Sequence, residues 1–411
     1  MAMQLPEETS EASPVLVSRQ PVLDVRDRVV GYRLSYSLLS GGFPVMPTPE
    51  EAIAIVDDVL TVIDHDEQVL GNKAHLSFSR EMLLRGELPE ISPDQVLLRI
   101  RYEDAAMRPL IPVIERAARH GFELELDELP SSGADLGLLD YFSAVEIDVS
   151  RWAMRDAAGA LERIQRARSI AVAAGVNTHA QRASARELGF EWFSGRFFAT
   201  PNVLAGTPIP IGDLHTIVEL YRMQRSDTTL EELVAVIEQE VGLGLRLLKY
   251  MNSAYFGFSG RVRSITQAAT MLGTRGLSRW ALIVAALSGS KPIPRELALT
   301  ALTRARACEL VGLDHEADID SDELFTIGLL STCDAVFGMP MAEVVKELPL
   351  TAEVIDALVD RAGPAGDILQ SVISYEQGEF LAPTLRASLL ANAAAYREAL
   401  DWARRAIYGM A

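Results

Sequence analysis

Short apolar runs alternate with longer amphipathic stretches from Val15 to about Pro201. Turn residues bound the short runs, which predicts β-strands, and the stretches between them have the apolar spacing of helices. Strands separated by helices favour a largely parallel sheet, and seven or so such units predict a closed or nearly closed barrel. Strands are expected at 15–17, 75–78, 96–100, 123–126, 144–147, 170–173 and 192–193, and helices over 50–63, 107–120 and 159–174, the last overlapping a strand.

The pattern changes after Pro201. The stretch 201–210 contains three prolines and a Gly-Thr pair, which indicates a linker. Beyond it the strand signals end, and an all-helical half is predicted. The apolar residues there follow the three-and-four spacing of helix faces, at Leu230, Leu233, Val234, Ile237 and Val241, and again at Leu385, Leu389, Ala393, Leu400 and Ile407.

Two helix starts carry the sequence of a capping box. Thr228 with Glu231 and Ser264 with Gln267 have the spacing at which each side chain can bond the backbone N–H of the other residue. Helices are therefore expected to begin after Thr228 and after Ser264.

Charge and cysteine content narrow the classes of protein. The chain has 57 acidic and 38 basic residues, a net charge of -19, and a field of this sign repels phosphate backbones and anionic lipids. We therefore expect neither a nucleic-acid nor a membrane partner. Cys308 and Cys333 are the only cysteines, which excludes a disulfide framework and a multi-cysteine zinc site. Residues 1–14 are polar, are expected to be disordered and do not resemble a signal peptide, which predicts a cytoplasmic protein.

Motifs for small ligands and metals fail their spacing tests. Gly242-Leu-Gly244 lacks the third glycine of a dinucleotide loop. The six histidines are scattered, so each is expected to be a surface or capped residue. Asp318, Asp320 and Asp322 resemble the start of a calcium loop, but Glu323 replaces its glycine. No cofactor is expected.

Two arginine pairs have the residue type that contacts phosphate groups. They are Arg261 with Arg263 and Arg304 with Arg306. Because the chain is acidic, we favour exposed, solubilising charge over phosphate binding for both pairs.

Longer phrases of the first half resemble a known family. Arg19-Gln-Pro-Val22, Val29-Val-Gly-Tyr-Arg-Leu34, Gly121-Phe-Glu-Leu-Glu-Leu-Asp-Glu128, Glu146-Ile-Asp148 and Phe193-Ser-Gly-Arg-Phe-Phe198 occur in the order found in EAL domains, the bacterial phosphodiesterases of cyclic di-GMP. The resemblance spans about 15–204 and implies a TIM-like (β/α) barrel.

The second half resembles an HDOD domain, an all-helical relative of the HD phosphohydrolase fold. The phrases are Leu247-Leu-Lys-Tyr-Met-Asn-Ser-Ala-Tyr-Phe-Gly257, Ser264-Ile-Thr-Gln-Ala268, Leu272-Gly273, Gly328-Leu-Leu-Ser-Thr332 and Leu348-Pro-Leu350. For Asn252 and Ser253 a capping role is favoured over a partner contact. The fold class is thus an α/β barrel followed by an all-α domain, with 1–14 disordered, an EAL-like domain over 15–204 and an HDOD domain over 205–411.

The EAL resemblance also implies a site, in which several carboxylates hold two divalent cations. Asp127, Glu128 and Asp148 keep acidic side chains. At the other positions this chain departs from the family. Arg33 stands where the family has its namesake glutamate, Ser37 where it has a phosphate-binding arginine, and His75 where it has a metal-binding asparagine. Arg99 replaces the next glutamate, Glu146 a lysine, Ala174 and Asn177 two later glutamates, and Ser194 a glutamine. We expect a vestigial pocket. Because a guanidinium can pair with a carboxylate, Arg33 or Arg99 is expected to pair with Asp127 or Asp148.

The HD resemblance leads to a similar expectation for the helical half. Ser331 and Thr332 occupy the place of the His-Asp pair, and Cys308 lies near an earlier histidine position. The sequence therefore predicts a signalling protein without enzymatic activity that acts through a protein partner of unknown identity, with a homodimer also open. The alternatives are a receptor that binds cyclic di-GMP, a residual phosphodiesterase, and a helical half that binds nucleotide or nucleic acid, against which the acidic charge weighs.

Overall fold

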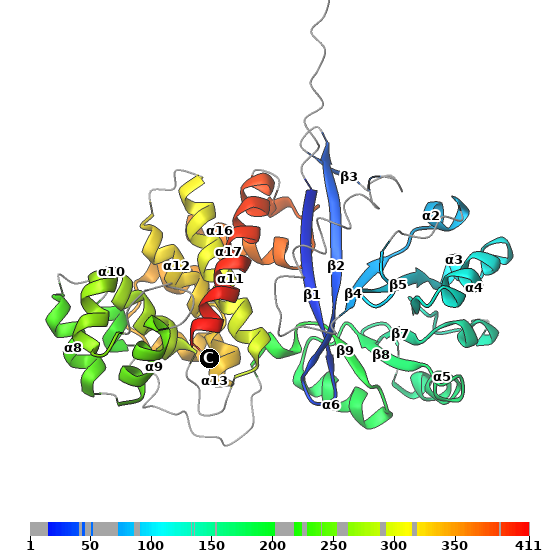
Figure 1. The fold of residues 1–411 in the computed structure, drawn as a ribbon, viewed down its shortest axis with the longest axis horizontal. Helices are drawn as coiled ribbons and strands as arrows, with labels where there is room; N and C mark the ends of the chain where they lie inside the picture. Colours follow the sequence, from blue (N-terminus) through cyan, green and yellow to red (C-terminus); the bar gives the residue numbers. More distant parts are fainter. Residues whose placement is uncertain are drawn as a thin grey trace, which may run out of the picture.

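The computed structural model has a barrel and a helical half, which lie side by side (Figure 1). The described residues are 15–40, 43–45, 51, 73–85, 91–132, 134, 136–152, 154–201, 218–223, 228–239, 241–252, 262–287, 293–314, 319–385 and 388–410. The predicted disordered stretch 1–14, the linker after Pro201 and the predicted helix 50–63 apart from Glu51 lie outside the described residues.

The described strands form one nine-stranded sheet, in which all strands but β3 close into a barrel. The order is β1-β9-β8-β7-β6-β5-β4-β2-β3, and the pairing of β1 with β2 closes the ring. β1 is antiparallel to both neighbours, whereas β2 and β4 to β9 are parallel to one another. The strands are β1 Val15–Asp24, β2 Val29–Ser40, β3 Phe43–Val45, β4 Lys73–Ser77, β5 Val96–Arg101, β6 Glu123–Asp127, β7 Ala144–Asp148, β8 Ile170–Ala174 and β9 Trp192–Ser194.

All seven predicted strands are confirmed, and the barrel prediction with them. The sequence reasoning missed β2 and β3. The helix predicted over 159–174 is wrong in its second part, because the chain turns at Arg168, whose φ is 62°, and then enters β8. The helices of this half are α2 Arg80–Arg85, α3 Tyr102–Ala105, α4 Ile111–Arg119, α5 Met154–Arg166 and α6 His179–Leu188, with 3₁₀ turns at Arg108–Leu110, Leu136–Tyr141 and Phe197–Ala199.

The second half consists of packed helices around one apolar core, as predicted. It contains the long helices α10 and α11, and α17 ends the described chain (Figure 1). Its described helices are α8 Leu230–Gln239, α9 Val241–Met251, α10 Ile265–Ala286, α11 Arg295–Asp314, α12 Ser321–Leu330, α13 Cys333–Phe337, α14 Met341–Val344, α15 Ala352–Val359, α16 Gly363–Glu376 and α17 Leu389–Met410, with 3₁₀ turns at Val345–Glu347 and Pro383–Leu385.

Two details at α8 correct the sequence prediction. Val241 does not extend α8 but begins α9. The capping box lies one residue later than predicted: the Thr229 N–H donates to Glu232 Oε2 at 2.9 Å, and the Glu232 N–H donates to Thr229 Oγ1 at 3.3 Å. Both differences follow from a helix that starts at Leu230 and ends at Gln239.

The other two capping predictions are confirmed in part, because the Gln267 side chain accepts from the Arg263 N–H at 3.0 Å and not from that of Ser264. The Gln267 N–H donates to Ser264 Oγ at 3.1 Å at the start of α10. Asn252 bonds the backbone on both sides of the next segment, donating to the Leu248 and Val262 carbonyl oxygens at 2.7 and 2.8 Å and accepting from the Val262 N–H at 2.8 Å. Asn252 thereby fixes the end of α9 against the start of the α10 region. Ser253 lies outside the described residues.

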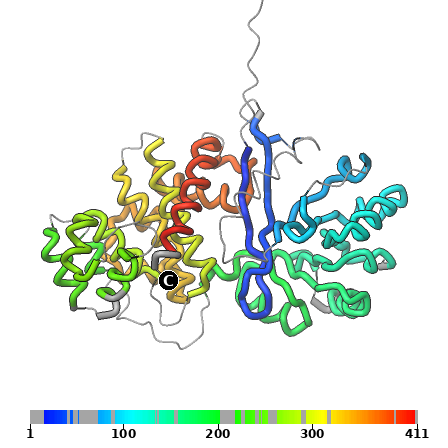
Figure 2. The backbone as a smooth tube through the Cα atoms, in the orientation of Figure 1, coloured from blue at the N-terminus to red at the C-terminus, as the bar shows by residue number. Residues whose placement is uncertain are grey.

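The strands β1 and β2 lie between the two halves (Figure 2). Leu16 on β1 and Leu39 on β2 are buried in the apolar core of the helical half, not in that of the barrel. α16 and α17 contact β1 directly. This strand pair therefore belongs structurally to both halves.

Candidate functional site

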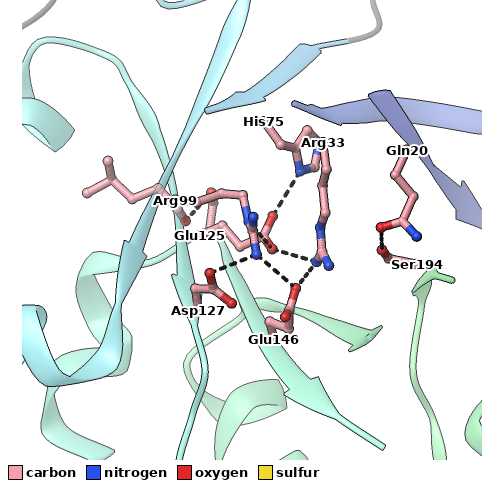
Figure 3. Close-up of polar contacts among 10 residues, drawn as sticks. Gln20, Arg33, His75, Arg99, Glu125, Asp127, Glu146 and Ser194 are labelled. Carbon is pink, nitrogen blue, oxygen red and sulfur yellow. Dashed lines mark hydrogen bonds and ion pairs between the residues drawn. The ribbon is translucent and has the colours of Figure 1, made fainter. Parts of the chain in front are cut away.

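A cluster of buried charges fills the middle of the barrel lumen, centred on Glu125 of β6 (Figure 3). Glu125 is completely buried. Its Oε1 lies 2.9 Å from Arg33 Nη2 and 3.4 Å from Arg99 Nε, and its Oε2 lies 2.9 Å from His75 Nδ1. One carboxylate thus joins side chains from β2, β4 and β5.

A second layer of acids completes the cluster toward the carboxyl ends of the strands. Glu146 of β7 forms ion pairs with both Arg33 and Arg99, the latter at 3.4 Å. Arg99 Nη2 lies 2.8 Å from Asp127 Oδ2. The expectation that an arginine of the lumen pairs with Asp127 or Asp148 is therefore confirmed for Arg99 and Asp127.

The electrostatics of the cluster follow from burial and pairing. Burial alone would raise the pKa of Glu125, but the charges of Arg33 and Arg99 and the His75 hydrogen bond outweigh it and hold that pKa well below its usual range. Burial lowers the pKa of His75, which keeps the ring neutral despite its hydrogen bond to Glu125. Burial and the nearby charge of Arg99 lower the pKa of Arg33 to about 10, so Arg33 stays charged at neutral pH.

Local sequence explains how His75 fits beside Arg33. Gly31 lies two residues before Arg33 on β2 and faces the same side of the strand. A Cβ atom at Gly31 would lie 2.6 Å from His75 Cδ2, so only glycine leaves room for the ring. The expectation that His75 is a surface or capped histidine is wrong, because its side chain is buried in the lumen.

The other predicted pocket residues lie apart from the cluster. Ser37 donates to the Val45 carbonyl oxygen and thereby holds β3. Asp148 accepts hydrogen bonds from Ser150 and pairs with Arg151 at 3.1 Å.

Four further predicted residues lie around the barrel with local roles. Ser194 donates to Gln20 Oε1 at 3.3 Å (Figure 3). Asn177 accepts from the Arg196 N–H at 3.4 Å, Glu128 is exposed with a φ of 56°, and Ala174 is buried at the end of β8.

The donors in the lumen do not fit a pair of divalent cations. Mg²⁺ and similar ions need carboxylate oxygens that are free to ligate. Here Glu125, Glu146 and Asp127 are paired with guanidinium groups, which would repel a metal ion at the same place. In the part of the chain that the structure describes, no group of three or more His, Cys, Asp or Glu side chains is arranged to hold a metal ion.

Beneath the cluster, the end of the barrel forms an open pocket. A cavity of about 390 Å³ lies at the amino ends of the parallel strands, where Lys73, Leu97, Glu123 and Trp192 line it together with His75. The rings of His75 and Trp192 have centroids 5.9 Å apart. Lys73 and Glu123 form an ion pair at 3.0 Å, so the cavity wall carries balanced charges.

The predicted HD positions of the helical half are buried, and one of them, Ser331, contacts Arg304. Arg304 Nη1 donates to Ser331 Oγ at 3.1 Å, and its Nη2 and Nε donate to Glu376 at 3.0 and 3.2 Å. Burial raises the pKa of the Cys308 thiol to about 12. Thr332 Oγ1 donates to the Leu329 carbonyl oxygen at 3.1 Å. Ser331, one of the two residues at the place of the HD pair, is therefore bonded by Arg304, whose charge is paired with the half-buried Glu376.

The expectation of exposed arginines is wrong for two of the four. Arg304 is 7% exposed, and Arg306 pairs with Glu309 at 2.8 Å and with Glu398 at 2.5 Å. Arg263 is exposed, and Arg261 lies outside the described residues. Two of these partners, Glu376 and Glu398, lie far along the chain and are invisible to local sequence patterns.

Comparisons with known proteins support the two-part organisation. Residues 214–361 match the family model described as the HDOD domain. The chain is 26% identical over 375 residues to "Cyclic di-GMP phosphodiesterase CdgJ" of Vibrio cholerae serotype O1, covering 89% of this chain and 85% of that protein. It is 24% identical over 401 residues to "Uncharacterized protein YuxH" of Bacillus subtilis, covering 94% of this chain and 98% of that protein.

Solved structures match the first half. "PaMucR Phosphodiesterase, c-di-GMP complex" matches with a TM-score of 0.32 and 16% identity over 44% of this chain and 89% of that chain. The FimX EAL domain from Pseudomonas aeruginosa bound to c-di-GMP matches with a TM-score of 0.33 and 15% identity over 45% of this chain and 89% of that chain.

The comparisons also correct one expectation. We expected no enzymatic activity, but the Vibrio cholerae relative, which aligns along most of both chains, is named a phosphodiesterase. No single helix of the described segments is long and apolar enough to cross a membrane. Ser321–Phe337 and Met341–Glu347 pass that test only as a pair bent by 106°.

The barrel topology and the family match describe the two parts of the molecule. The chain carries an HDOD domain in its C-terminal half and, ahead of it, an eight-stranded barrel that resembles EAL domains.

Proposed function

We propose that the chain is a cyclic di-GMP signalling protein that regulates a protein partner through direct contact with its helical half. The observation that carries the proposal is that one relative, named for cyclic di-GMP, aligns with this chain through both the barrel and the HDOD domain. The polar centre of the helical half is filled by its own paired side chains, so a partner meets this half at its surface.

Exposed apolar side chains on the helical half define the variants that test this proposal. Leu313 at the end of α11 is 61% exposed, and Leu390 at the start of α17 is 52% exposed. An aspartate at such a position would place an unpaired charge in any interface that covers it, which is costly. Leu84 of α2, on the barrel, is also 61% exposed and supplies a matched control.

The experiment is affinity capture with the full chain from its native cell. Leu313→Asp or Leu390→Asp is expected to lose the partner, whereas Leu84→Asp keeps it. The proposal is contradicted if Leu84→Asp loses the partner while Leu313→Asp and Leu390→Asp both keep it.

Hydrolysis of cyclic di-GMP is a second candidate function. It is favoured by the name of the Vibrio cholerae relative, which aligns along most of both chains. The test incubates the full chain with cyclic di-GMP and Mg²⁺ or Mn²⁺. Turnover that EDTA abolishes and Asp148→Asn reduces supports this candidate, and absence of turnover with either ion removes it.

A further inference from the structure

The two halves meet at a buried polar contact between Tyr32, Arg19 and Glu296. Tyr32 of β2 donates its hydroxyl hydrogen to Glu296 Oε1 at 2.8 Å, and Arg19 Nη2 of β1 lies 3.9 Å from Glu296 Oε2. The Arg19 guanidinium lies over the Tyr32 ring, 4.2 Å from its centroid. The exposed fractions of Tyr32, Arg19 and Glu296 are 1%, 9% and 5%. We call these three side chains the latch.

The latch joins the barrel strands to a defined place on the helical half, the start of α11. Glu296 lies in the first turn of α11, the helix that also carries Arg304. A second contact lies nearby, where the Val17 N–H of β1 donates to the hydroxyl oxygen of Tyr375 on α16 at 3.1 Å. Burial raises the pKa of Tyr32, which keeps its hydroxyl protonated and able to donate. Because these groups are buried, losing one bond leaves its partner without solvent to replace it.

The latch residues are direct neighbours of residues in the lumen. Tyr32 precedes Arg33 on β2, and Arg19 precedes Gln20 on β1. Successive side chains of a strand point to opposite faces. Accordingly, Arg33 contacts Glu125 and Gln20 contacts Ser194 inside the barrel, whereas their neighbours contact the helical half.

The register of the two strands makes this arrangement a single unit. Gln20 pairs with Arg33, and Pro21 pairs with Tyr32, in the antiparallel ladder of β1 and β2. Because Tyr32 and Arg33 are adjacent on β2, a shift of the backbone at Arg33 also moves Tyr32. Because a hydrogen bond weakens steeply with distance and angle, a small shift is enough to change the latch.

We propose that β1 and β2 couple the charge cluster of the lumen to the docking of the helical half. When Arg33 loses its acidic partners, β2 moves and the bond from Tyr32 to Glu296 weakens. The start of α11 is then held less firmly. The coupling does not depend on which ligand or partner acts on the barrel. Through it, a change in the lumen alters how firmly the helical half is docked.

Arg33→Met and Arg99→Met form a matched pair that tests the coupling in the full chain. Both substitutions remove one guanidinium from the same cluster, but Arg99 lies on β5, between β4 and β6 in the barrel. Hydrogen exchange measured by mass spectrometry reads the start of α11. We expect Arg33→Met to speed exchange there by at least about fivefold relative to Arg99→Met, the lower end of typical coupling between sites.

Tyr32→Phe tests the latch itself and remains informative if Arg33→Met fails to fold. It removes only the hydroxyl, and Tyr36→Phe on the same strand is its control, since the Tyr36 hydroxyl donates to the Ser77 carbonyl oxygen within the barrel. Coupling is reciprocal, so Tyr32→Phe is expected to speed exchange both at the start of α11 and in β4 around His75. Tyr36→Phe is expected to leave α11 unchanged.

Three results would overturn the proposal. One is equal exchange at α11 in the Arg33→Met and Arg99→Met variants, which would mean a general loss of stability. Another is a Tyr32→Phe protein whose β4 exchange matches that of the parent chain. The third is a Tyr32→Phe, Arg33→Met double variant in which Arg33→Met still adds its full effect at α11.

Discussion

Replacing Glu125 with glutamine removes one negative charge from the lumen and leaves the shape of the side chain nearly unchanged. Arg33 and His75, each at 2.9 Å, and Arg99, at 3.4 Å, then face a neutral amide in place of the carboxylate. Breaking a buried ion pair costs about 3–5 kcal/mol because the remaining charge is left without compensation. Both arginines keep Glu146, so we expect a loss of about 3 kcal/mol, the lower end of that range.

Native-state hydrogen exchange of the barrel strands measures this loss. The method resolves the barrel from the helical half, which matters because a two-part chain does not have to unfold in one step. Glu123→Gln is the matched control, on the same strand and the same face. Glu123 is 47% exposed and pairs with Lys73, so its loss is expected to cost less than about 1 kcal/mol. Equal effects of the two substitutions would refute the reasoning.

Three further predictions concern pH, a thiol and a close helix contact. The lowered pKa values of His75 and Glu125 mean that the unfolded chain takes up protons first, so barrel stability is expected to fall below about pH 6.5 and more steeply below about pH 4.5. Urea midpoints at pH 7, 5.5 and 4 check this, and a constant midpoint contradicts it. Cys308 is expected to resist iodoacetamide at pH 8 until the chain is unfolded in urea, as quantified by mass spectrometry; rapid native labelling would exclude the buried thiol. Gly328→Ala would place a Cβ atom 2.6 Å from the α11 backbone, so it is expected to lower the free energy of unfolding in urea by about 1–3 kcal/mol. Gly159→Ala is the control: its Cβ meets no atom within 4 Å, so the substitution is expected to be neutral or slightly stabilising.

Sequence patterns predict the strands of this barrel well, because each is a short apolar run between turns. β2 was missed although it carries a clear signal. Tyr32, Leu34, Tyr36 and Leu38 alternate with polar residues, which is the period of a strand with two different faces. The pattern also contains a charged residue, Arg33, which is unusual in a buried strand.

The site was predicted only in part, for a physical reason. The Arg99 and Asp127 pairing follows from charge and strand order. Glu125 was missed, although the alternation of acids and leucines from Glu123 to Asp127 places it on the lumen face. Which arginine meets which acid depends on how the barrel closes, and no local pattern contains that information.

The helical half shows the same limit. Arg304 pairs with Glu376, and Tyr32 of the barrel bonds Glu296 of α11, across 72 and 264 positions of sequence. Spacing rules describe neighbours on one helix or one strand pair. Burial of a charge by a distant partner is therefore found only in the folded structure.

Arg33 and Arg99, and not divalent cations, hold the acids of the lumen in place. Hydrogen exchange of β6 and β7 in the full chain tests it, measured with EDTA and then with Mg²⁺ or Mn²⁺ in millimolar excess. We expect the same protection of both strands in all three conditions, and lower protection in the Arg99→Met variant. Protection of these strands that rises with metal ion and is lost with EDTA would contradict it.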